Sequence, residues 1–334
     1  MKRLALVGAV ALLAATGARA ATPLPAHLYA PYFETWTTDG ITTTAQQSGA
    51  RYFTLAFLET LSKSSCTLAW NGSRNDLETG GRYLDDIASL RAIGGDVIPS
   101  FGGWSADQGG TEIADSCKDV NAIAAAYEDV ITRYDVTRLD MDVEGRSLTR
   151  SDGIDRRNEA LKLVEDWAAA QGRPFQVSYT VPTSASGLEP SGVAILQNAI
   201  ANGTRVDVVD VMAFDYYDKV TTDMGTAAIN AANGLVAQLH TLYPAKTRAQ
   251  LDAMVGITLM PGLDDYPKKT EKTTVAHAQQ VAAYAGSQGF DTLSIWAIQR
   301  DNGDCPGSTG SNDCSGIVQN TWDFSQVLEP FTGP

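Results

Sequence analysis

Three acidic residues that alternate with apolar residues stand out near the middle of the chain. Asp140, Asp142 and Glu144 are separated by a single methionine and a single valine, and a leucine precedes Asp140. Successive side chains of a β-strand point to opposite faces, so the three carboxylates share one face and the apolar side chains share the other. Carboxylates this close together in a buried site cannot all ionise easily, so at least one should have a raised pKa. A general acid needs a raised pKa to work near neutral pH, and Glu144, nearest the end of the strand, is the predicted acid.

Two other interpretations of this segment are open. The carboxylates could form an exposed polar edge, although the wholly apolar opposite face argues against this. They could also bind a hard divalent cation such as magnesium or calcium, because these ions prefer oxygen ligands. A metal site built on histidines is not indicated, because His27, His240 and His277 lie far apart in the sequence. We predict neither a resident metal nor an organic cofactor.

In the rest of the chain, predicted strands alternate with predicted helices. Short apolar or β-branched runs predict eight strands, at 28–33, 52–58, 96–101, 138–143, 175–181, 206–214, 254–258 and 292–296. Helical periodicity predicts helices between them, at 42–49, 119–134, 154–170, 192–200, 226–242 and 273–287. This alternation predicts an α/β fold, a single (β/α)8 TIM barrel, whose active site would form at the C-terminal ends of the strands. A doubly wound open sheet competes, but no Gly-x-Gly-x-x-Gly follows the first strand.

The composition and net charge of the chain exclude several classes of protein and of binding partner. The 334 residues are 44% hydrophobic and 19% charged, which is typical of a globular chain and excludes disorder and collagen. The formal net charge of -14 repels phosphate groups, so we expect neither nucleic acid nor a membrane as a partner. We expect a monomer.

The N-terminus predicts export. A basic pair at 2–3 precedes an apolar run at 4–13, and Ala-Arg-Ala at 18–20 fits a signal peptidase site. The apolar run is too short to span a membrane. We therefore expect residues 1–20 to be a cleaved signal peptide and residues 21–334 to form one secreted catalytic domain.

The four cysteines should pair in an oxidising compartment. Cys305 and Cys314 lie in a short stretch rich in Gly, Ser, Asn and Asp, and a local pair needs no long excursion of the chain. The preferred pairs are Cys305–Cys314 and Cys66–Cys117, although four cysteines allow three connectivities.

The carboxylate motif resembles the Asp-x-Asp-x-Glu signature of glycoside hydrolase family 18, which contains chitinases and endo-β-N-acetylglucosaminidases. Three more segments are similar to motifs of that family: Ser-Phe-Gly-Gly at 100–103, Met-Ala-Phe-Asp at 212–215, and Trp296 at the end of the eighth strand. The four motifs occur in the family's order. The resemblance extends over roughly residues 27 to 300, and compact bacterial and archaeal chitinases are the most similar group.

Two positions depart from the family's pattern. A longer form of the signature has a further aspartate three residues before Asp140, where this chain has Thr137. The tyrosine of the sixth-strand motif is replaced by Phe214, which has no hydroxyl group. We expect Tyr216 to take over this role, with Tyr217 as the alternative.

The resemblance implies a substrate-assisted mechanism, in which the sugar's own 2-acetamido oxygen attacks the anomeric carbon. Glu144 would be the general acid and base, Asp142 would orient the acetamido group, and Asp140 would set the protonation of Asp142. The expected substrate-binding residues are Asp215, Tyr216, Met212, Trp296 and Trp104. Tyr32, Phe33 and Trp36 end the first strand and are further candidates to line the groove, whereas Trp167 is expected in the core.

The expected function is that of a secreted, endo-acting chitinase that binds chitin or N-acetylglucosamine oligosaccharides. Residues 259–291 are too few for the small α+β domain that some family members insert after the seventh strand, which favours an open groove and internal cleavage. Three alternatives are kept: an endo-β-N-acetylglucosaminidase acting on the chitobiose core of N-glycans, a non-catalytic chitin-binding lectin-like relative, and a metal-dependent hydrolase on the same fold.

Overall fold

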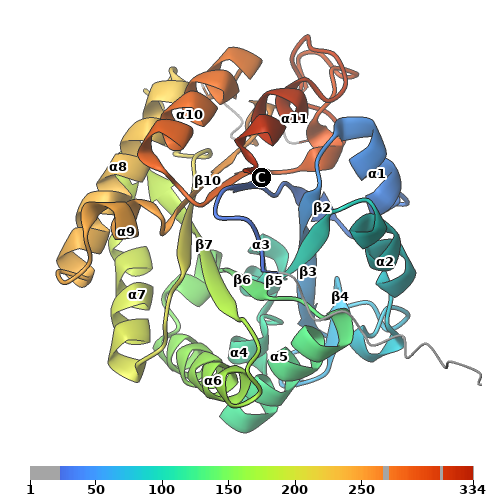
Figure 1. The fold of residues 1–334 in the computed structure, drawn as a ribbon, viewed down its shortest axis with the longest axis vertical. Coiled ribbons are helices and arrows are strands. Elements are labelled where there is room, and N and C mark those ends of the chain that lie inside the picture. The colour runs from blue at the N-terminus through green and yellow to red at the C-terminus, as the bar shows by residue number, and fades with distance from the viewer. Residues whose placement is uncertain (1–22, 266–270, 309–310, 334) are drawn as a thin grey trace, which may run out of the picture.

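Alternating apolar strands and amphipathic helices build a barrel of parallel strands enclosed by helices (Figure 1). The structure is a computed structural model, and it describes residues 23–265, 271–308 and 311–333. The barrel strands are β1 and β2 (Leu28–Tyr29 and Tyr32–Glu34), β3 (Tyr52–Thr60), β5 (Asp96–Gly102), β6 (Arg138–Asp142), β7 (Gln176–Ser184), β9 (Val208–Met212), β10 (Val255–Leu259) and β13 (Thr292–Ile295). All eight predicted strands are thereby confirmed, and so is the predicted (β/α)8 class.

The first strand closes the barrel in two pieces. β1 pairs with β13 on one side, and β2 pairs with β3 on the other. Pro31 lies between the two pieces, and a proline has no N–H group to donate to a ladder. The sheet consequently runs without an open edge from β2 through β3, β5, β6, β7, β9, β10 and β13 back to β1.

The register beside β6 decides which side chains meet inside the barrel. Asp140 pairs with Ser100 of β5 on one side and with Ser178 of β7 on the other. Asp142 pairs with Gly102 and Thr180 in the same way. Small and hydroxyl-bearing residues thus flank the two aspartates from both neighbouring strands.

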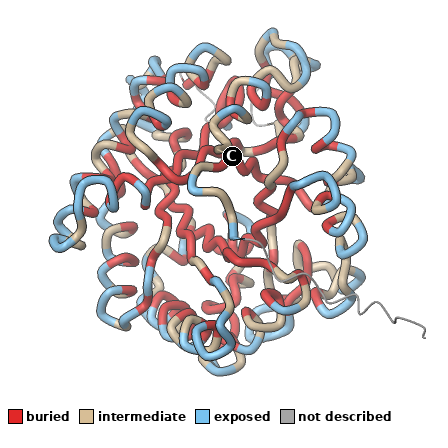
Figure 2. The backbone as a smooth tube through the Cα atoms, in the orientation of Figure 1, coloured by how far each residue is buried: buried red, intermediate tan, exposed pale blue. Residues whose placement is uncertain are grey.

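An outer layer of helices covers the barrel, and the buried positions of Figure 2 concentrate on the strands and the inward faces of the helices. The larger helices are α1 (Ile41–Ser48), α2 (Leu84–Ala92), α5 (Val120–Tyr134), α6 (Ser151–Ala170), α7 (Pro190–Asn202), α8 (Met224–Leu242) and α10 (Val275–Gln288). Shorter helices are α3 (Trp104–Gly109), α4 (Ile113–Ser116), α9 (Arg248–Asp252), α11 (Asp323–Leu328) and the 3-10 turns η1 (Glu78–Gly80), η2 (Gly145–Leu148), η3 (Ile298–Arg300) and η4 (Glu329–Phe331). The six predicted helices are confirmed, with small shifts at their ends.

The sequence analysis missed helix α2, and its ends explain why. It begins after Tyr83, which has a left-handed φ of 74° and makes no side-chain cap. Its apolar positions Leu84, Ile87 and Leu90 fill only nine residues, too few for a clear periodic signal. The helix nevertheless supports α1, because Asp86 accepts hydrogen bonds from the first two N–H groups of that helix, at 2.6 and 3.0 Å.

Several short strands lie outside the ring of barrel strands. β4 (Leu68–Trp70) pairs with β3, β8 (Gly187–Leu188) pairs with β7, and β11 (Gly262–Leu263) pairs with β12 (Lys272–Thr273). In the described part of 259–291, the chain forms only this β11–β12 hairpin and α10, and no α+β domain. The predicted absence of an insertion domain is therefore confirmed for the residues that the structure describes.

Both predicted disulfides are present, Cys66–Cys117 and Cys305–Cys314. The predicted signal peptide, residues 1–20, lies outside the described residues. Among the helices of the described part of the chain, none has the length and apolar character needed to cross a membrane.

Candidate active site

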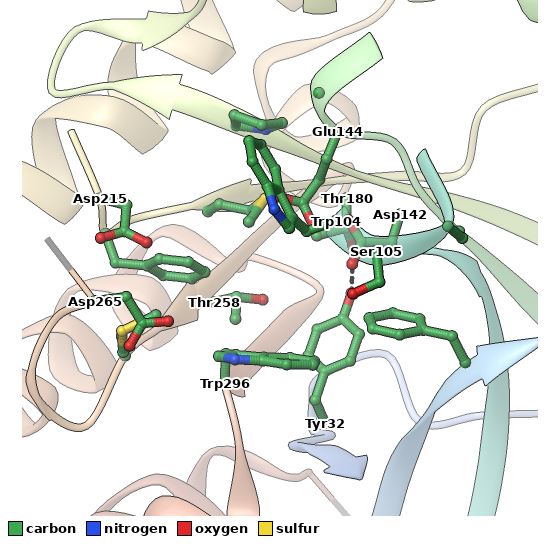
Figure 3. A pocket seen from close by; sticks show the side chains of 18 of the residues that line it. Tyr32, Trp104, Ser105, Asp142, Glu144, Thr180, Asp215, Thr258, Asp265 and Trp296 are labelled. Atoms are coloured by element: carbon green, nitrogen blue, oxygen red, sulfur yellow. Dashed lines mark hydrogen bonds between the residues drawn. The ribbon is translucent and has the colours of Figure 1, made fainter. Parts of the chain in front are cut away.

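A cavity of about 910 Å³ opens at the C-terminal ends of the barrel strands (Figure 3). Six residues predicted for the site line it: Asp142, Glu144, Met212, Asp215, Trp296 and Trp104. Asp140 lies beneath the cavity, deeper in the barrel. In the close view, Glu144 and Trp104 lie opposite Trp296 and Tyr32, so carboxylates and aromatic rings face the same space.

Glu144 follows strand β6, and a hydrogen bond from its main chain fixes its position. Its N–H group donates to a carboxylate oxygen of Asp107 on helix α3. Burial raises the pKa of Glu144 to about 7, while a hydrogen bond from the main-chain N–H of Trp104 opposes this and the charge of Asp215 adds to it. Near neutral pH, the side chain can therefore both give and take a proton, which a general acid and base requires.

Asp140 is surrounded by hydroxyl groups. Its carboxylate accepts hydrogen bonds from Tyr32 at 3.0 Å, Ser100 at 2.6 Å, Ser178 at 2.8 Å and Thr180 at 2.9 Å. Burial raises the pKa of Asp140, and the hydroxyl groups lower it again because they stabilise the charged form. The four donors favour an ionised Asp140 directly below Asp142.

Asp142 lies between these two acids and is only 3% exposed. Burial raises the pKa of Asp142 well above its usual range, and the charges of Glu144 and Asp140 act in the same direction. Its Oδ1 atom is buried and has no hydrogen-bond partner among the described residues. Asp142 nevertheless lines the cavity, so its carboxyl group is placed to accept a hydrogen bond from a bound group.

Asp210 and Asp107 are among the acidic residues near the cavity that were not predicted from the sequence. Asp210 on β9 is buried, accepts a hydrogen bond from Thr258 at 2.8 Å, and has a pKa raised well above its usual range by burial. The alternation rule could have found it, because Asp210 precedes Met212 by two positions on an apolar strand. Asp107 gave no such signal, since only the folded loop brings it to the N–H of Glu144.

Aromatic side chains form one side of the cavity. The ring of Trp296 stacks on Phe57 at 5.5 Å and meets the edge of Tyr32 at 5.4 Å, and Trp36 lies 6.2 Å away. Sugar rings bind well against such faces. Trp104 is 60% exposed at the rim. These positions agree with the expectation that strand-end aromatics line the groove.

Phe33 does not line the cavity, contrary to expectation. Its ring is buried in the core and packs edge-on against Phe53 at 6.1 Å. It neighbours Tyr32 on strand β2, so the alternation of side chains sends Tyr32 inward and Phe33 outward. Trp167 packs against the core, as expected.

The preference for Tyr216 over Tyr217 is corrected by the structure. Tyr217 lines the cavity and is 59% exposed, whereas Tyr216 is not a lining residue and its hydroxyl group is buried. Asp215 and Tyr217 both have left-handed φ angles, of 48° and 55°. This turn brings the side chain of Tyr217, rather than that of Tyr216, to the cavity.

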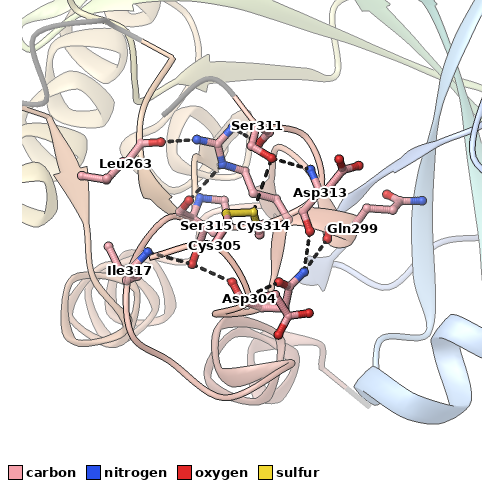
Figure 4. Close-up of a disulfide and its surroundings, with 12 residues drawn as sticks. Leu263, Gln299, Asp304, Cys305, Ser311, Asp313, Cys314, Ser315 and Ile317 are labelled. Carbon is pink, nitrogen blue, oxygen red and sulfur yellow. Dashed lines mark hydrogen bonds between the residues drawn. A yellow bond between two sulfur atoms is a disulfide. The ribbon is translucent and has the colours of Figure 1, made fainter. Parts of the chain in front are cut away.

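A polar wall completes the cavity, formed by Asp265 and Asn312. Arg300 joins the two loops that carry them, because it donates to Asp265 at 3.0 Å and to the Ser311 carbonyl at 2.7 Å. It also donates to the carbonyl of Leu263. Figure 4 shows Leu263 and Ser311 around this arrangement, beside the Cys305–Cys314 disulfide.

The arrangement suits acid–base chemistry on a ligand with apolar ring faces. Within the part of the chain that the structure describes, no group of three or more His, Cys, Asp or Glu side chains is arranged to hold a metal ion. Asp140 and Asp210 instead contact hydroxyl groups, and Asp107 and Glu144 contact main-chain N–H groups.

Comparisons with known proteins agree with this geometry. The family model described as glycosyl hydrolases family 18 matches residues 29–259. The solved structure of active domain 2 of a chitinase from Pyrococcus furiosus is 30% identical, with a TM-score of 0.80 over 93% of this chain and 96% of that one. A structure of that domain complexed with chito-oligosaccharides gives the same values.

Two curated proteins are also similar. Endochitinase 11 of Metarhizium anisopliae is 32% identical over 287 residues, which is 83% of this chain and 53% of that protein. A probable bifunctional chitinase/lysozyme of Escherichia coli is 32% identical over 322 residues, 92% of this chain and 35% of that protein. The chain thus spans between a third and about half of the length of these relatives.

Proposed function

The chain belongs to family 18 of the glycosyl hydrolases, and from that premise we propose that it is a chitinase, a hydrolase of the β-1,4 bonds between N-acetylglucosamine units. One observation carries the proposal: Glu144, with a pKa of about 7, and Asp142 line one cavity whose opposite side holds Trp296. The relatives named above support chitin oligosaccharides as the substrate class.

In the proposed mechanism, protonated Glu144 donates its proton to the glycosidic oxygen, and the bond from that oxygen to the anomeric carbon breaks. The sugar's 2-acetamido oxygen forms a new bond to the same carbon, which gives an oxazolinium intermediate and retains configuration overall. Ionised Glu144 then removes a proton from water, and the resulting hydroxyl opens the oxazolinium. Both steps balance without a metal or cofactor.

Asp142 would accept a hydrogen bond from the acetamido N–H and stabilise the positive charge that develops on the intermediate. Its place in the lining of the cavity supports this role. Asp140, held by four hydroxyl groups, would keep a negative charge below Asp142. Asp215 and Tyr217 would bind the acetamido group from the other side, and Tyr217 replaces Tyr216 in this role because only Tyr217 lines the cavity.

We further propose internal cleavage of the chitin chain, outside the cell. The described part of 259–291 forms the β11–β12 hairpin and α10 and no additional domain beside the groove, which supports internal cuts. Two disulfides support an oxidising compartment, in line with the proposed signal peptide at residues 1–20. We propose a monomer as the working form.

The experiment is mass spectrometry of the products after the purified protein meets chitohexaose and a high-mannose N-glycopeptide in one tube. We expect dimers and trimers from the hexamer and an intact glycopeptide. Release of the glycan with one N-acetylglucosamine left on the peptide would make the protein an endo-β-N-acetylglucosaminidase instead. If neither substrate changes, the hydrolase proposal fails and a lectin-like binding role replaces it.

A further inference from the structure

The chain that follows strand β9 makes a constrained turn at the edge of the cavity. Asp215, Tyr217 and Lys219 have φ angles of 48°, 55° and 65°, in the left-handed region. Residues with a side chain adopt this conformation only at an energetic cost, because Cβ approaches the carbonyl oxygen closely. Two of these three residues, Asp215 and Tyr217, line the cavity. Other contacts must therefore stabilise the turn in the form that presents them.

Three consecutive main-chain N–H groups of the turn donate to two carboxylates. The N–H of Asp215 donates to Oδ2 of Asp264 at 3.0 Å. The N–H groups of Tyr216 and Tyr217 donate to Oε2 and Oε1 of Glu271, at 2.8 and 3.1 Å. Hydrogen bonds to ionised acceptors are stronger than those between neutral groups. The turn is thus held along its whole length by side chains from elsewhere in the chain.

The two carboxylates come from the β11–β12 hairpin. Asp264 directly follows β11, Glu271 directly precedes β12, and the N–H of Asp264 donates to the Glu271 carbonyl at 3.4 Å. Both side chains are only 1% exposed. Burying two neighbouring acids is unfavourable unless they make compensating hydrogen bonds, and the N–H groups of the turn supply them.

The two acids differ in how they bind the turn. Burial raises the pKa of Asp264 well above its usual range, and the charges of Asp215 and Glu271 add to this. A protonated Asp264 still has one oxygen free to accept the N–H of Asp215. Glu271 uses both of its oxygens as acceptors, one for the N–H of Tyr216 and one for the N–H of Tyr217.

We propose that Asp264 and Glu271 are positioning residues for hydrolysis, which hold Asp215 and Tyr217 in place at the cavity without touching the substrate themselves. The inference rests on the proposed function for its effect on turnover, whereas the effect on the turn is independent of any substrate. Glu271 anchors Tyr216 and Tyr217, and Asp264 anchors Asp215.

Asp264 accepts with one oxygen and Glu271 with both, so substitutions that remove one acceptor can test the proposal. Glu271→Gln leaves one acceptor for two N–H groups and faces an amide N–H₂ toward the other, so one bond is lost. Asp264→Asn keeps an acceptor oxygen for Asp215 and has no charge, like protonated Asp264. Asp264→Ala removes that acceptor. Asp252→Asn is the matched control, because Asp252 is buried and paired with Arg248 at 2.8 Å on α9, before β10 and so at the opposite end of the barrel.

The experiment combines amide hydrogen exchange of a peptide covering residues 215–217 with kcat/KM on chitohexaose. For Glu271→Gln and Asp264→Ala, we expect exchange at least about tenfold faster and kcat/KM about tenfold lower, because one hydrogen bond to a buried group is lost. Asp264→Asn and Asp252→Asn should stay within about threefold of the wild type in both measurements.

Unchanged exchange at 215–217 in Glu271→Gln and Asp264→Ala would overturn the proposal, as would an Asp264→Asn protein that is impaired as strongly as Asp264→Ala. If Glu271→Gln does not fold, the Asp264→Ala and Asp264→Asn pair decides the question alone. A wild-type protein without turnover would refute the proposed function, and the exchange rates would still decide whether the two acids hold the turn.

Discussion

At the scale of single residues, the environment of Glu144 makes the most direct connection between structure and rate. Burial raises its pKa to about 7, and the charge of Asp215 acts in the same direction. A general acid works only in its protonated form, which predominates below this pKa and is lost as the pH rises through it. The proposed mechanism therefore predicts that Glu144 sets the alkaline side of the pH profile.

We predict that kcat/KM on chitohexaose is retained up to about pH 7 and then falls about tenfold for each further pH unit. The measurement is kcat/KM from about pH 5 to about pH 9, with a check at each pH that the protein stays folded. A profile that stays flat through about pH 8.5 would show that a different group donates the proton.

The two tyrosines after Asp215 give a second prediction at this scale. Tyr217→Phe removes a hydroxyl group at the cavity and should lower kcat/KM by about a hundred- to a thousandfold, the size seen when a single transition-state donor is lost. Tyr216→Phe is the matched control, because its hydroxyl group is buried and has no hydrogen-bond partner among the described residues. Its turnover and stability should match the wild type. The reverse order would restore the original preference for Tyr216.

How much of the site could be read from the sequence depends on the kind of contact. The alternation of side chains along one strand correctly predicted that Asp140 and Asp142 share a face. The same rule also predicts that Asp210 faces the inside of the barrel. Asp107 and Glu271 could not be found in this way, because they contact main-chain N–H groups of loops far from them in sequence. Such contacts depend on loop geometry, for which the spacing of residue types gives no signal.

At the scale of elements, two loops and one arginine shape the polar wall of the cavity. Arg300 in η3 is buried and donates to the Pro261 carbonyl at 3.0 Å, to Asp265 and to Ser311. The guanidinium group reaches all of these acceptors because its donors lie in a fixed plane. The positions of Asp265 and Asn312 at the cavity thus depend on one side chain.

Arg300→Lys should lower the free energy of unfolding by about 2–3 kcal/mol, because a single ammonium group cannot replace four donor contacts. We expect KM for chitohexaose to rise more than kcat falls, since Asp265 and Asn312 line the cavity but are not the carboxylates proposed to react. Arg248→Lys is the control: Arg248 is largely exposed, and its loss should change stability by less than about 0.5 kcal/mol. Equal effects of the two variants on urea unfolding would contradict this account.

The elements themselves were largely predictable, whereas their register was not. Apolar runs located all eight strands, and periodicity located six helices, because both depend on local pattern. The pairing of Asp140 with Ser100 and Ser178 depends on how neighbouring strands slide past one another, and this gives Asp140 two of its four hydroxyl donors. Helix α2 was missed because no capping residue marks its start.

At the scale of the whole molecule, the two disulfides stabilise the fold to different extents. Cys66 and Cys117 are 51 residues apart, and Cys305 and Cys314 are 9 apart. A longer closed loop restricts the unfolded chain more, which predicts contributions of about 4 and about 2.5 kcal/mol. The burial of Cys117 adds to the first contribution.

We therefore expect the Cys66→Ser/Cys117→Ser variant to unfold at a lower urea concentration than the Cys305→Ser/Cys314→Ser variant. The second variant should show the larger rise in KM, because its loop carries Asn312 at the cavity. A greater loss of stability from the shorter loop would contradict this ranking. The local pairing of Cys305 with Cys314 could be anticipated from the sequence, because closing a short loop needs little chain rearrangement.

The central claim is that Glu144 gives up a proton to a chitin chain bound in this cavity. The measurement that tests it most directly compares turnover and binding of chitohexaose by the wild type and by Glu144→Gln, which keeps the side chain's shape and removes the acid. We predict that kcat falls by at least about a hundredfold while the Kd from calorimetry and the unfolding temperature remain close to those of the wild type. Substantial residual turnover in Glu144→Gln would contradict the account.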